Sequence, residues 1–171
     1  DDVIKKVSDY VLRSKLYASR NRWFVVVSEK IVAISQGRSY FIWDIKPSFF
    51  AKFLSRYVAK TPFGIGLGSP WTMELAIEEV GLPKILFASF VAGITKPFGI
   101  KGIFYKIAGP EARSIDGPTE YSLYPSNVSA KLAPEDPQKV ATDVTEYLRD
   151  NLKISDEKQF LGAVIIDAND L

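Results

Sequence analysis

The chain has 171 residues, of which 47% are hydrophobic and 25% are charged, and its formal net charge is +2. This composition suits a globular protein with a substantial core, and so small a net charge gives no reason to expect a nucleic-acid partner. The sequence contains no cysteine and no histidine, which excludes disulfides, thiolate zinc sites and nucleophile systems that use His or Cys. Chemistry in these residues must therefore rest on carboxylates, Lys, Arg, Tyr, Ser, Thr or backbone amides.

No signal peptide is visible, and no apolar run reaches the roughly 20 residues that a membrane-spanning helix needs. The longest run, residues 85–95, lies between Lys84 and Lys96, and we expect it to form a short buried element. We therefore expect a cytoplasmic protein without a membrane partner. The chain begins at Asp1 rather than at Met, and we expect both natural ends to lie beyond it.

The first half of the chain predicts helices and strands in mixed order. Apolar residues recur at helical spacing over residues 2–16. The run Trp23–Ser28 is almost wholly aromatic and β-branched, which predicts a buried strand. Residues 36–38 form a turn, and residues 39–45 are a candidate short strand. Residues 47–60 predict a helix, and we expect the core to receive its largely aromatic stripe: Phe49, Phe50, Phe53, Leu54 and Tyr57.

The middle of the chain contains a well-delimited helix. Ser69 is a good N-cap and Pro70 suits the first turn, whereas Gly81 suits the end, so the pattern predicts a helix over Pro70–Val80. The apolar segment that follows, residues 83–95, is either a second helix or a strand, and its length leaves both open.

The last third predicts a strand, a helix and a strand. Residues 103–107 are predicted as a strand between glycine turns. Asp136 and Pro137 open a helix that runs to about Leu152, and Phe160–Ile166 is the last strand. Mixed helices and strands define an α/β or α+β fold, and we expect residues 1–171 to form a single globular domain.

A glycine-rich loop, residues 64–69, comes directly before the predicted helix at Pro70. Backbone amides at a helix N-terminus can bind a phosphate group. The loop lacks the terminal Lys-Ser/Thr pair of a P-loop and has its third glycine in the wrong place for a dinucleotide fingerprint. We therefore favour a flexible connection to a well-capped helix over a phosphate site.

Two aspartates are the candidate metal ligands. Asp116 lies between Gly109-Pro110 and Gly117-Pro118, in a segment too rich in turn-forming residues to be core, where a carboxylate can simply cap backbone amides. Asp167 closes the last predicted strand, and residues at the carboxyl end of a buried strand face the crevice where open α/β folds bind ligands. Together the two carboxylates would suit Mg²⁺ or Mn²⁺ completed by substrate phosphates.

Three segments resemble the coenzyme F-420 gamma-glutamyl ligase family. Residues 23–38, WFVVVSEKIVAISQGR, are similar to that family's opening strand and turn. Ile115-Asp116 stands where the family has Ile-Asp, and residues 162–169, GAVIIDAN, resemble its Val-Ile-Ile-Thr-Asp-Thr-Asn segment. The order and spacing of the motifs carry the resemblance, which is poor over residues 39–103.

The resemblance implies an α/β ligase-like fold, a homodimer and nucleotide-dependent amide formation. GTP or ATP with Mg²⁺ or Mn²⁺ would activate a small-molecule carboxylate, and the amino group of an amino acid such as L-glutamate would attack it. The family's metal-binding aspartates correspond to Asp116 and Asp167. The candidate nucleotide-binding residues are Lys30, Arg38, Thr119 and Asn169, and no catalytic residue is assigned.

The chain departs from the family pattern at two positions. Ile34 replaces a lysine, and Thr119 replaces an asparagine three residues beyond the first aspartate. These departures leave two alternatives to a ligase. One is a non-catalytic module that binds a nucleotide or metabolite, and the other is a structural or interaction domain whose aromatic residues fill a core and a dimer interface.

Overall fold

The computed structural model describes residues 2–14, 22–58, 65–100, 102–119, 122–152 and 159–167. It contains both helices and strands, which confirms the mixed α/β class. The chain divides into two compact units. The first unit joins residues 1–38 to residues 134–171, and the second is residues 39–133. That the whole chain forms one domain with a ligase-like fold stays a prediction.

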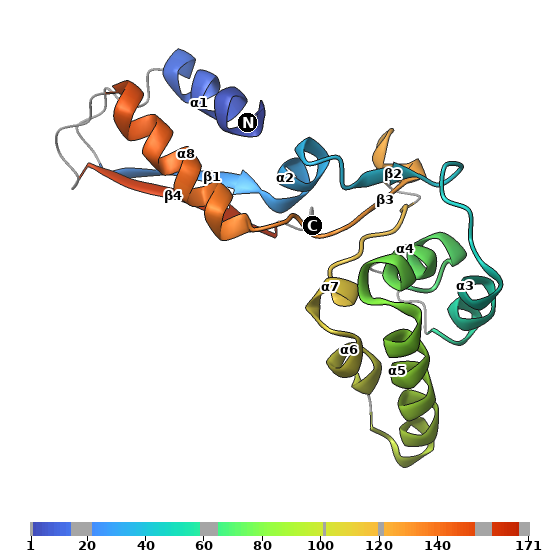
Figure 1. The fold of residues 1–171 in the computed structure, drawn as a ribbon. Coiled ribbons are helices and arrows are strands. Elements are labelled where there is room, and N and C mark those ends of the chain that lie inside the picture. The colour runs from blue at the N-terminus through green and yellow to red at the C-terminus, as the bar shows by residue number, and fades with distance from the viewer. Residues whose placement is uncertain are drawn as a thin grey trace. The chain divides into compact units, whose positions relative to one another are not determined.

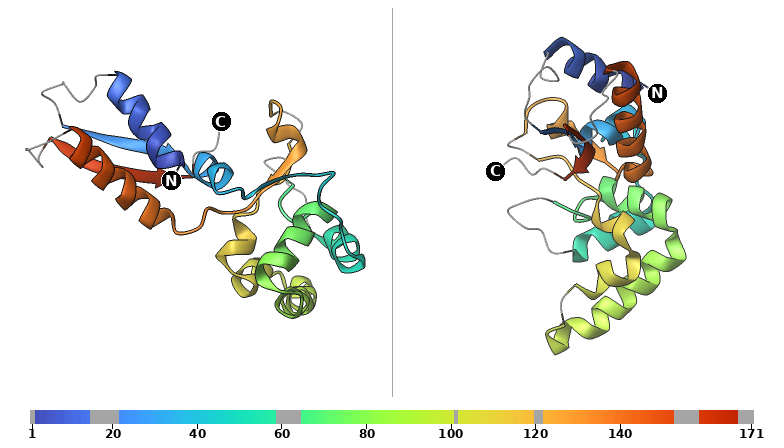
Figure 2. Two further views of the ribbon diagram at one scale, coloured as in Figure 1. Left: turned by 45° about the horizontal axis from the view of Figure 1, so that its top comes forward. Right: turned by 90° about the vertical axis from the view of Figure 1, so that its left-hand side faces the viewer.

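The first unit is built on two parallel strands, β1 (Trp23–Ser28) and β4 (Phe160–Ile166). Helix α8 (Pro137–Leu152) packs on β4, and helix α1 (Asp2–Ser14) lies beside α8 (Figures 1 and 2). A seven-residue helix, α2 (Glu29–Ser35), follows β1 directly. The predicted helices and strands of this unit are therefore confirmed, except that residues 15 and 16 of the first predicted helix lie outside the described residues. The helix at α2 was not predicted.

The core of the first unit lies under α8. Val144, Leu148 and Phe160 are fully buried there, and the Trp23 ring stacks on Phe160 with ring centroids 4.4 Å apart. The opposite face of the strand pair is different. It exposes large apolar side chains, so the prediction that both strands are buried holds for one face only: Phe24, Val26, Leu161, Val164 and Ile166.

A bulge in β4 adjusts this strand pairing. Trp23 pairs with Phe160 but Val25 pairs with Ala163, so β4 contains one extra residue between the two pairs. Gly162 lies in that interval with a φ of 114°, a conformation that side-chain-bearing residues rarely adopt. The Ala163 amide next to it donates to Thr145 Oγ1 at 2.8 Å, which ties the bulge to α8.

The second unit is mostly helical. Its strands are β2 (Ser39–Phe41) and β3 (Ser129–Lys131), which pair antiparallel. Its α-helices are short, apart from two that follow each other along the chain. The helical elements are α3 (Phe49–Leu54), η2 (Ser55–Tyr57), α4 (Pro70–Val80), α5 (Leu82–Thr95), η3 (Lys96–Phe98), α6 (Ile103–Ala108), α7 (Pro110–Arg113) and η4 (Ser126–Val128).

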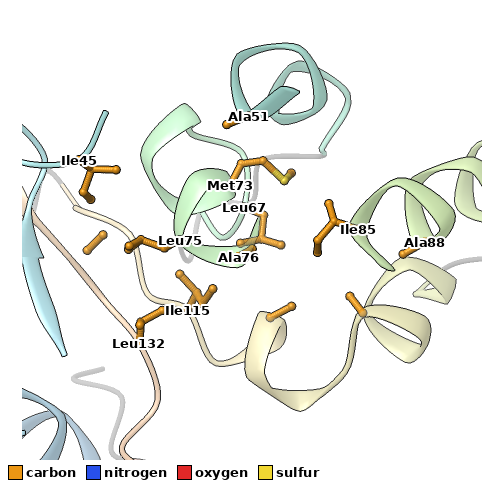
Figure 3. Packing of buried hydrophobic residues seen from close by; sticks show 13 residues of the cluster. Ile45, Ala51, Leu67, Met73, Leu75, Ala76, Ile85, Ala88, Ile115 and Leu132 are labelled. Atoms are coloured by element: carbon orange, nitrogen blue, oxygen red, sulfur yellow. The ribbon is translucent and has the colours of Figure 1, made fainter. Parts of the chain in front are cut away.

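The core of the second unit forms around α4 (Figure 3). Leu67, Met73 and Ala76 are fully buried, and Ile85 of α5 reaches the same cluster. The predicted boundaries of α4 are confirmed: Ser69 Oγ accepts a hydrogen bond from the Thr72 amide at 3.1 Å. The open choice over residues 83–95 is also decided, because this segment is helix α5.

The prediction of a strand over residues 103–107 is wrong. The segment is helix α6, which begins after Gly102 and ends at Gly109, both with positive φ. An aromatic and β-branched run of this length fits either element. Packing against α5 decides it, since a helix turns Phe104, Ile107 and Ala108 toward the core of the unit.

The predicted burial of the α3 stripe is wrong for its aromatic members, whereas Leu54 packs against the core. Phe49 is 75% exposed and Tyr57 is 68% exposed. The side of α3 that packs is instead the one carrying Ala51, which with Ser55 is buried. The helical segment is shorter than predicted, as is β2, and Lys60 lies outside the described residues.

The expectation of a buried element over residues 85–95 is correct for one side of α5 only. Ile85 and Ala88 are fully buried, whereas Phe87 is 60% exposed and Phe90 is 66% exposed. In the part of the chain that is described, no helix is long and apolar enough to cross a membrane.

Candidate functional site

The parallel pairing of β1 with β4 places two predicted site segments at the same end of the strand pair, where both strands finish. Ser28, the last residue of β1, pairs with Ile166, the last residue of β4. The residues that follow each strand therefore leave the pair from the same end. These are Asp167 after β4 and Lys30, in the first turn of α2, after β1.

Asp167 is exposed at that end of the strand pair, where its carboxylate is accessible to a cation from solvent. Its position directly after the strand agrees with the sequence prediction. Asn169, predicted to bind nucleotide, lies outside the described residues.

Helix α2 shows what surrounds Ile34, the residue that stands where the resembled family has a lysine. The helix places Lys30 and Ile34 four residues apart, and such residues lie on one helix face about one turn from each other. Ile34 is 50% exposed, so this position, where the family that the sequence resembles has a lysine, is accessible but uncharged. Lys30 therefore brings a cationic group to the same face of the helix.

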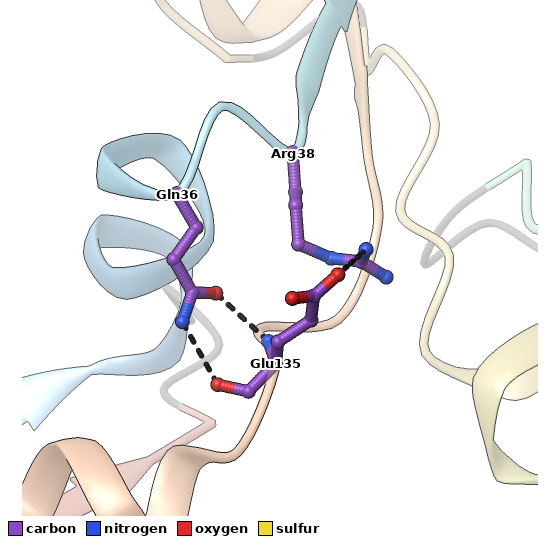
Figure 4. Close-up of polar contacts among 3 residues, drawn as sticks. All are labelled: Gln36, Arg38 and Glu135. Atoms are coloured by element: carbon purple, nitrogen blue, oxygen red, sulfur yellow. Dashed lines mark hydrogen bonds and ion pairs between the residues drawn. The ribbon is translucent and has the colours of Figure 1, made fainter.

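The turn after α2 is held to the start of α8 by three side-chain interactions (Figure 4). The Gln36 side chain donates to the Glu135 carbonyl and accepts from the Glu135 amide, both at 2.8 Å. Arg38, the third predicted nucleotide-binding residue, pairs through Nη1 with Glu135 Oε1 at 2.8 Å. The Arg38 guanidinium is thus engaged by a carboxylate that is 72% exposed.

A hollow of about 280 Å³ lies beside this turn in the first unit. Its polar lining consists of Ser35, Gln36, Glu135, Asp136, Lys139 and Asp143. None of the predicted site residues lines it.

In the second unit, Asp116 is fixed by its backbone. Its amide donates to the Lys131 carbonyl at 2.9 Å, and the Lys131 amide donates to the Asp116 carbonyl at 2.8 Å. Residues that exchange both hydrogen bonds in an antiparallel pair project their side chains to the same face. The Asp116 side chain is exposed, whereas Lys131 is 6% exposed and its Nζ donates to Ser126 Oγ at 3.3 Å.

The segment around Asp116 packs more tightly than its turn-forming residues suggested. Ile115 and Pro118 are buried on either side of it, so the prediction that this segment is not core is wrong for these neighbours. A Cβ on Gly117 would lie 3.0 Å from Thr72 Cγ2 and 3.7 Å from the Gly66 carbonyl oxygen. Glycine at 117 therefore allows the Asp116 segment to approach the glycine-rich loop.

The described part of the glycine-rich loop supports a structural role. Ser69 is buried, and its hydroxyl already caps α4 and bonds Thr72 Oγ1 at 2.8 Å. The Tyr105 ring lies behind the loop, with its hydroxyl 3.3 Å from the position of a Cβ on Gly66. Burial raises the pKa of Tyr105, and a hydrogen bond with the Leu67 backbone opposes that rise. Gly64 lies outside the described residues.

Thr119, the remaining predicted nucleotide-binding residue, is hydrogen-bonded to Ser122. The Ser122 amide donates to its carbonyl at 3.2 Å, and the two hydroxyl groups are hydrogen-bonded. The Thr119 side chain is half-buried three residues beyond Asp116.

The structure assigns the two aspartates to different units, Asp167 to the first and Asp116 to the second. Their convergence on one metal ion stays a prediction. Among the described residues, no group of three or more acidic side chains is close enough to hold a metal ion. Two carboxylates with substrate phosphates remain a sufficient ligand set for Mg²⁺.

Lys131 is a candidate residue that the sequence did not single out. A buried lysine is rare unless its charge is paired. The available signal was a single lysine in a run of small and apolar residues, Ser129-Ala130-Lys131-Leu132. That pattern does not indicate which residue lies opposite Lys131 in the sheet. Only the strand pairing shows that this residue is Asp116.

Comparison with known proteins adds no family assignment: no protein-family model matches the chain, and no curated protein is a significant match.

Proposed function

We propose that this chain is a nucleotide- and metal-dependent ligase that joins the amino group of an amino acid to a carboxylate substrate. The observation that carries the proposal is the parallel pairing of β1 with β4, because it gathers Asp167 and Lys30 at one end of the strand pair. An acidic and a basic side chain at the carboxyl ends of parallel strands suit a metal-bound phosphate.

Asp116 and Asp167 would hold one Mg²⁺ or Mn²⁺ together with the phosphates of GTP or ATP. When bound, the metal would neutralise phosphate charge, and the γ-phosphoryl group would pass to the substrate carboxylate. The products of that step are an acyl phosphate and the nucleoside diphosphate. The amino group of the second substrate, L-glutamate in the family that the sequence resembles, then displaces phosphate and forms the amide.

Cationic side chains would hold the rest of the phosphate charge. Lys30 and Arg38 are the candidates in the first unit, with Thr119 and Asn169 as polar partners of the nucleotide. Lys131 is a further candidate, since it lies directly opposite Asp116 in the strand pairing. A second copy of the chain would complete a homodimer of the kind that the resemblance implies.

Phosphate release from GTP and ATP tests this proposal. We expect release that requires Mg²⁺ or Mn²⁺, rises when L-glutamate and a carboxylate acceptor are supplied together, and is lost in Asp167→Ala. Asp150→Asn, an exposed aspartate near the end of α8, is the control and retains the activity. Full turnover in Asp167→Ala contradicts the assignment of this residue.

A non-catalytic module that binds a nucleotide is the second candidate. The observation that favours it is the exposed Ile34 on the Lys30 face of α2, where the family has a charged residue. Calorimetry with a nucleotide and Mg²⁺ separates the two. Binding without any product supports the module, whereas metal-dependent product formation supports the ligase.

A further inference from the structure

We propose that the outer face of the α5–α6 hairpin, residues 82–108, binds the surface of an anionic lipid membrane. The inference is independent of the ligase activity. The sequence alone predicted a buried element here and no membrane partner. The exposure of one side of α5 changes that expectation.

The outer face of α5 carries an apolar stripe. Phe87, Phe90 and Ile94 follow each other at intervals of three and four residues, so they lie on one side of α5. Their exposed fractions are 60%, 66% and 52%. Phe98 and Ile100, just beyond the helix, are also exposed, at 78% and 50%.

The other side of α5 explains why this stripe faces outward. Ile85 and Ala88 pack into the core of the second unit, and α6 lies alongside α5 (Figure 1). The helix is therefore apolar on both sides, with its smaller buried side chains serving the fold. Scattered exposed apolar residues are normal, but three on one side of a helix, with two more directly after it, indicate a surface that contacts a partner.

The charge of the hairpin identifies that partner. Between Glu79 and Glu111 the sequence has four lysines and no acidic residue. Three of these lysines, Lys84, Lys96 and Lys106, are exposed, and Lys101 lies outside the described residues. An apolar stripe within a segment whose only charged residues are lysines matches a membrane surface. There, phenylalanine side chains enter the boundary between headgroups and acyl chains while lysines meet lipid phosphates.

The same charges argue against a second copy of the chain as the partner. A symmetric dimer through this face would bring each lysine-flanked stripe against an identical one. Like charges facing each other oppose such a contact. The protein would therefore lie on the membrane rather than self-associate through this stripe, and no described helix is long enough to cross it.

Vesicle flotation with the full chain tests the proposal. We expect binding to vesicles of phosphatidylglycerol mixed with phosphatidylcholine, weaker binding at high salt, and little binding to phosphatidylcholine alone. The double variant Phe87→Ser/Phe90→Ser should bind the vesicles at least about tenfold more weakly, because two apolar anchors are removed. Lys96→Glu/Lys106→Glu should bind at least about fivefold more weakly.

The control is Phe24→Ser/Leu123→Ser, which removes two exposed apolar side chains outside the hairpin. It should bind vesicles as the unchanged chain does. Circular dichroism confirms folding of every variant, and sedimentation without vesicles gives the oligomeric state. Vesicle binding that survives Phe87→Ser/Phe90→Ser overturns the proposal. So does the absence of vesicle binding together with an oligomer that only the hairpin variant dissociates, since a second copy then covers the face.

Discussion

The backbones of Asp116 and Lys131 hold each other through two hydrogen bonds, of 2.9 and 2.8 Å. Neither bond uses the Asp116 carboxylate, which is exposed. Backbone contacts thus fix the position of this residue without using its carboxylate. A backbone held in place in this way is what a preorganised ligand requires.

The first prediction compares the stability of variants at Asp116 and at its neighbour Gly117. Asp116→Asn should change the free energy of unfolding by less than about 1 kcal/mol, because the residue is exposed, the new side chain has nearly the same size, and both backbone bonds survive. Gly117→Ala should cost more, about 1–3 kcal/mol, because its Cβ would lie 3.0 Å from Thr72 Cγ2 in a packed environment. Urea denaturation of the two variants measures both values. A larger loss in Asp116→Asn than in Gly117→Ala contradicts the account.

The second prediction concerns the turn that carries Arg38. Gln36→Ala removes two hydrogen bonds to the Glu135 backbone and should cost about 1–2 kcal/mol of unfolding free energy. Glu135→Ala leaves those two bonds and removes only the ion pair with Arg38, so it should cost less than about 1 kcal/mol. Guanidinium is unsuitable here because it screens the ion pair, and urea denaturation at low salt is the appropriate measurement. The reverse order of the two costs would show that the ion pair dominates.

The third prediction concerns Tyr105 and alkaline pH. Burial raises its pKa in the folded protein, so above the ordinary tyrosine pKa of about 10 the unfolded chain releases this proton while the folded chain retains it. Stability from the neutral phenol is thus fully present below that pH and is lost as the pH rises above it. Tyr105→Phe should make unfolding less sensitive to pH in this range. Tyr10→Phe, an exposed tyrosine in α1, is the control, and an unchanged slope in Tyr105→Phe contradicts the prediction.

The fourth prediction compares two glycines. Gly162→Ala should cost about 1–2 kcal/mol, because its φ is 114° and the new Cβ would lie 3.3 Å from Thr145 Oγ1. Gly93→Ala, inside α5 with nothing within 4 Å of the new Cβ, should stabilise the protein by about 0.5–1 kcal/mol. Thermal unfolding of both variants shows whether each substitution lowers or raises the stability. Equal effects would mean that the bulge at Gly162 does not constrain the chain.

Local signals predicted the elements whose ends are marked in the sequence. Ser69, Pro70 and Gly81 delimit α4 through capping chemistry that acts over a few residues. Residues 103–107 carried no such information, since an apolar aromatic run of this length fits a strand or a helix. This segment forms helix α6 because it packs against α5, a contact between residues that are distant in the sequence.

Burial was harder to predict than secondary structure. The stripes on α3 and α5 have the helical spacing of core-facing residues, yet the structure turns Phe49 and Phe90 outward and packs Ala51 and Ala88. The spacing of apolar residues identifies an apolar face of a helix, but it does not show whether another element covers that face. The candidate site shows the same limit: the strand-end position of Asp167 was predictable, whereas the pairing of Asp116 with Lys131 depends on residues fifteen positions apart forming a bridge.

Binding of Mn²⁺ by the two aspartates tests the central claim most directly. Calorimetry in the presence of a non-hydrolysable GTP analogue should give one ion per chain. Asp116→Asn and Asp167→Asn should each weaken binding by at least about tenfold. The double variant should lose little more than either single variant, because ligands of one ion are not independent. Unchanged affinity in either single variant, or losses that add in full, would show that the two carboxylates do not share a metal ion.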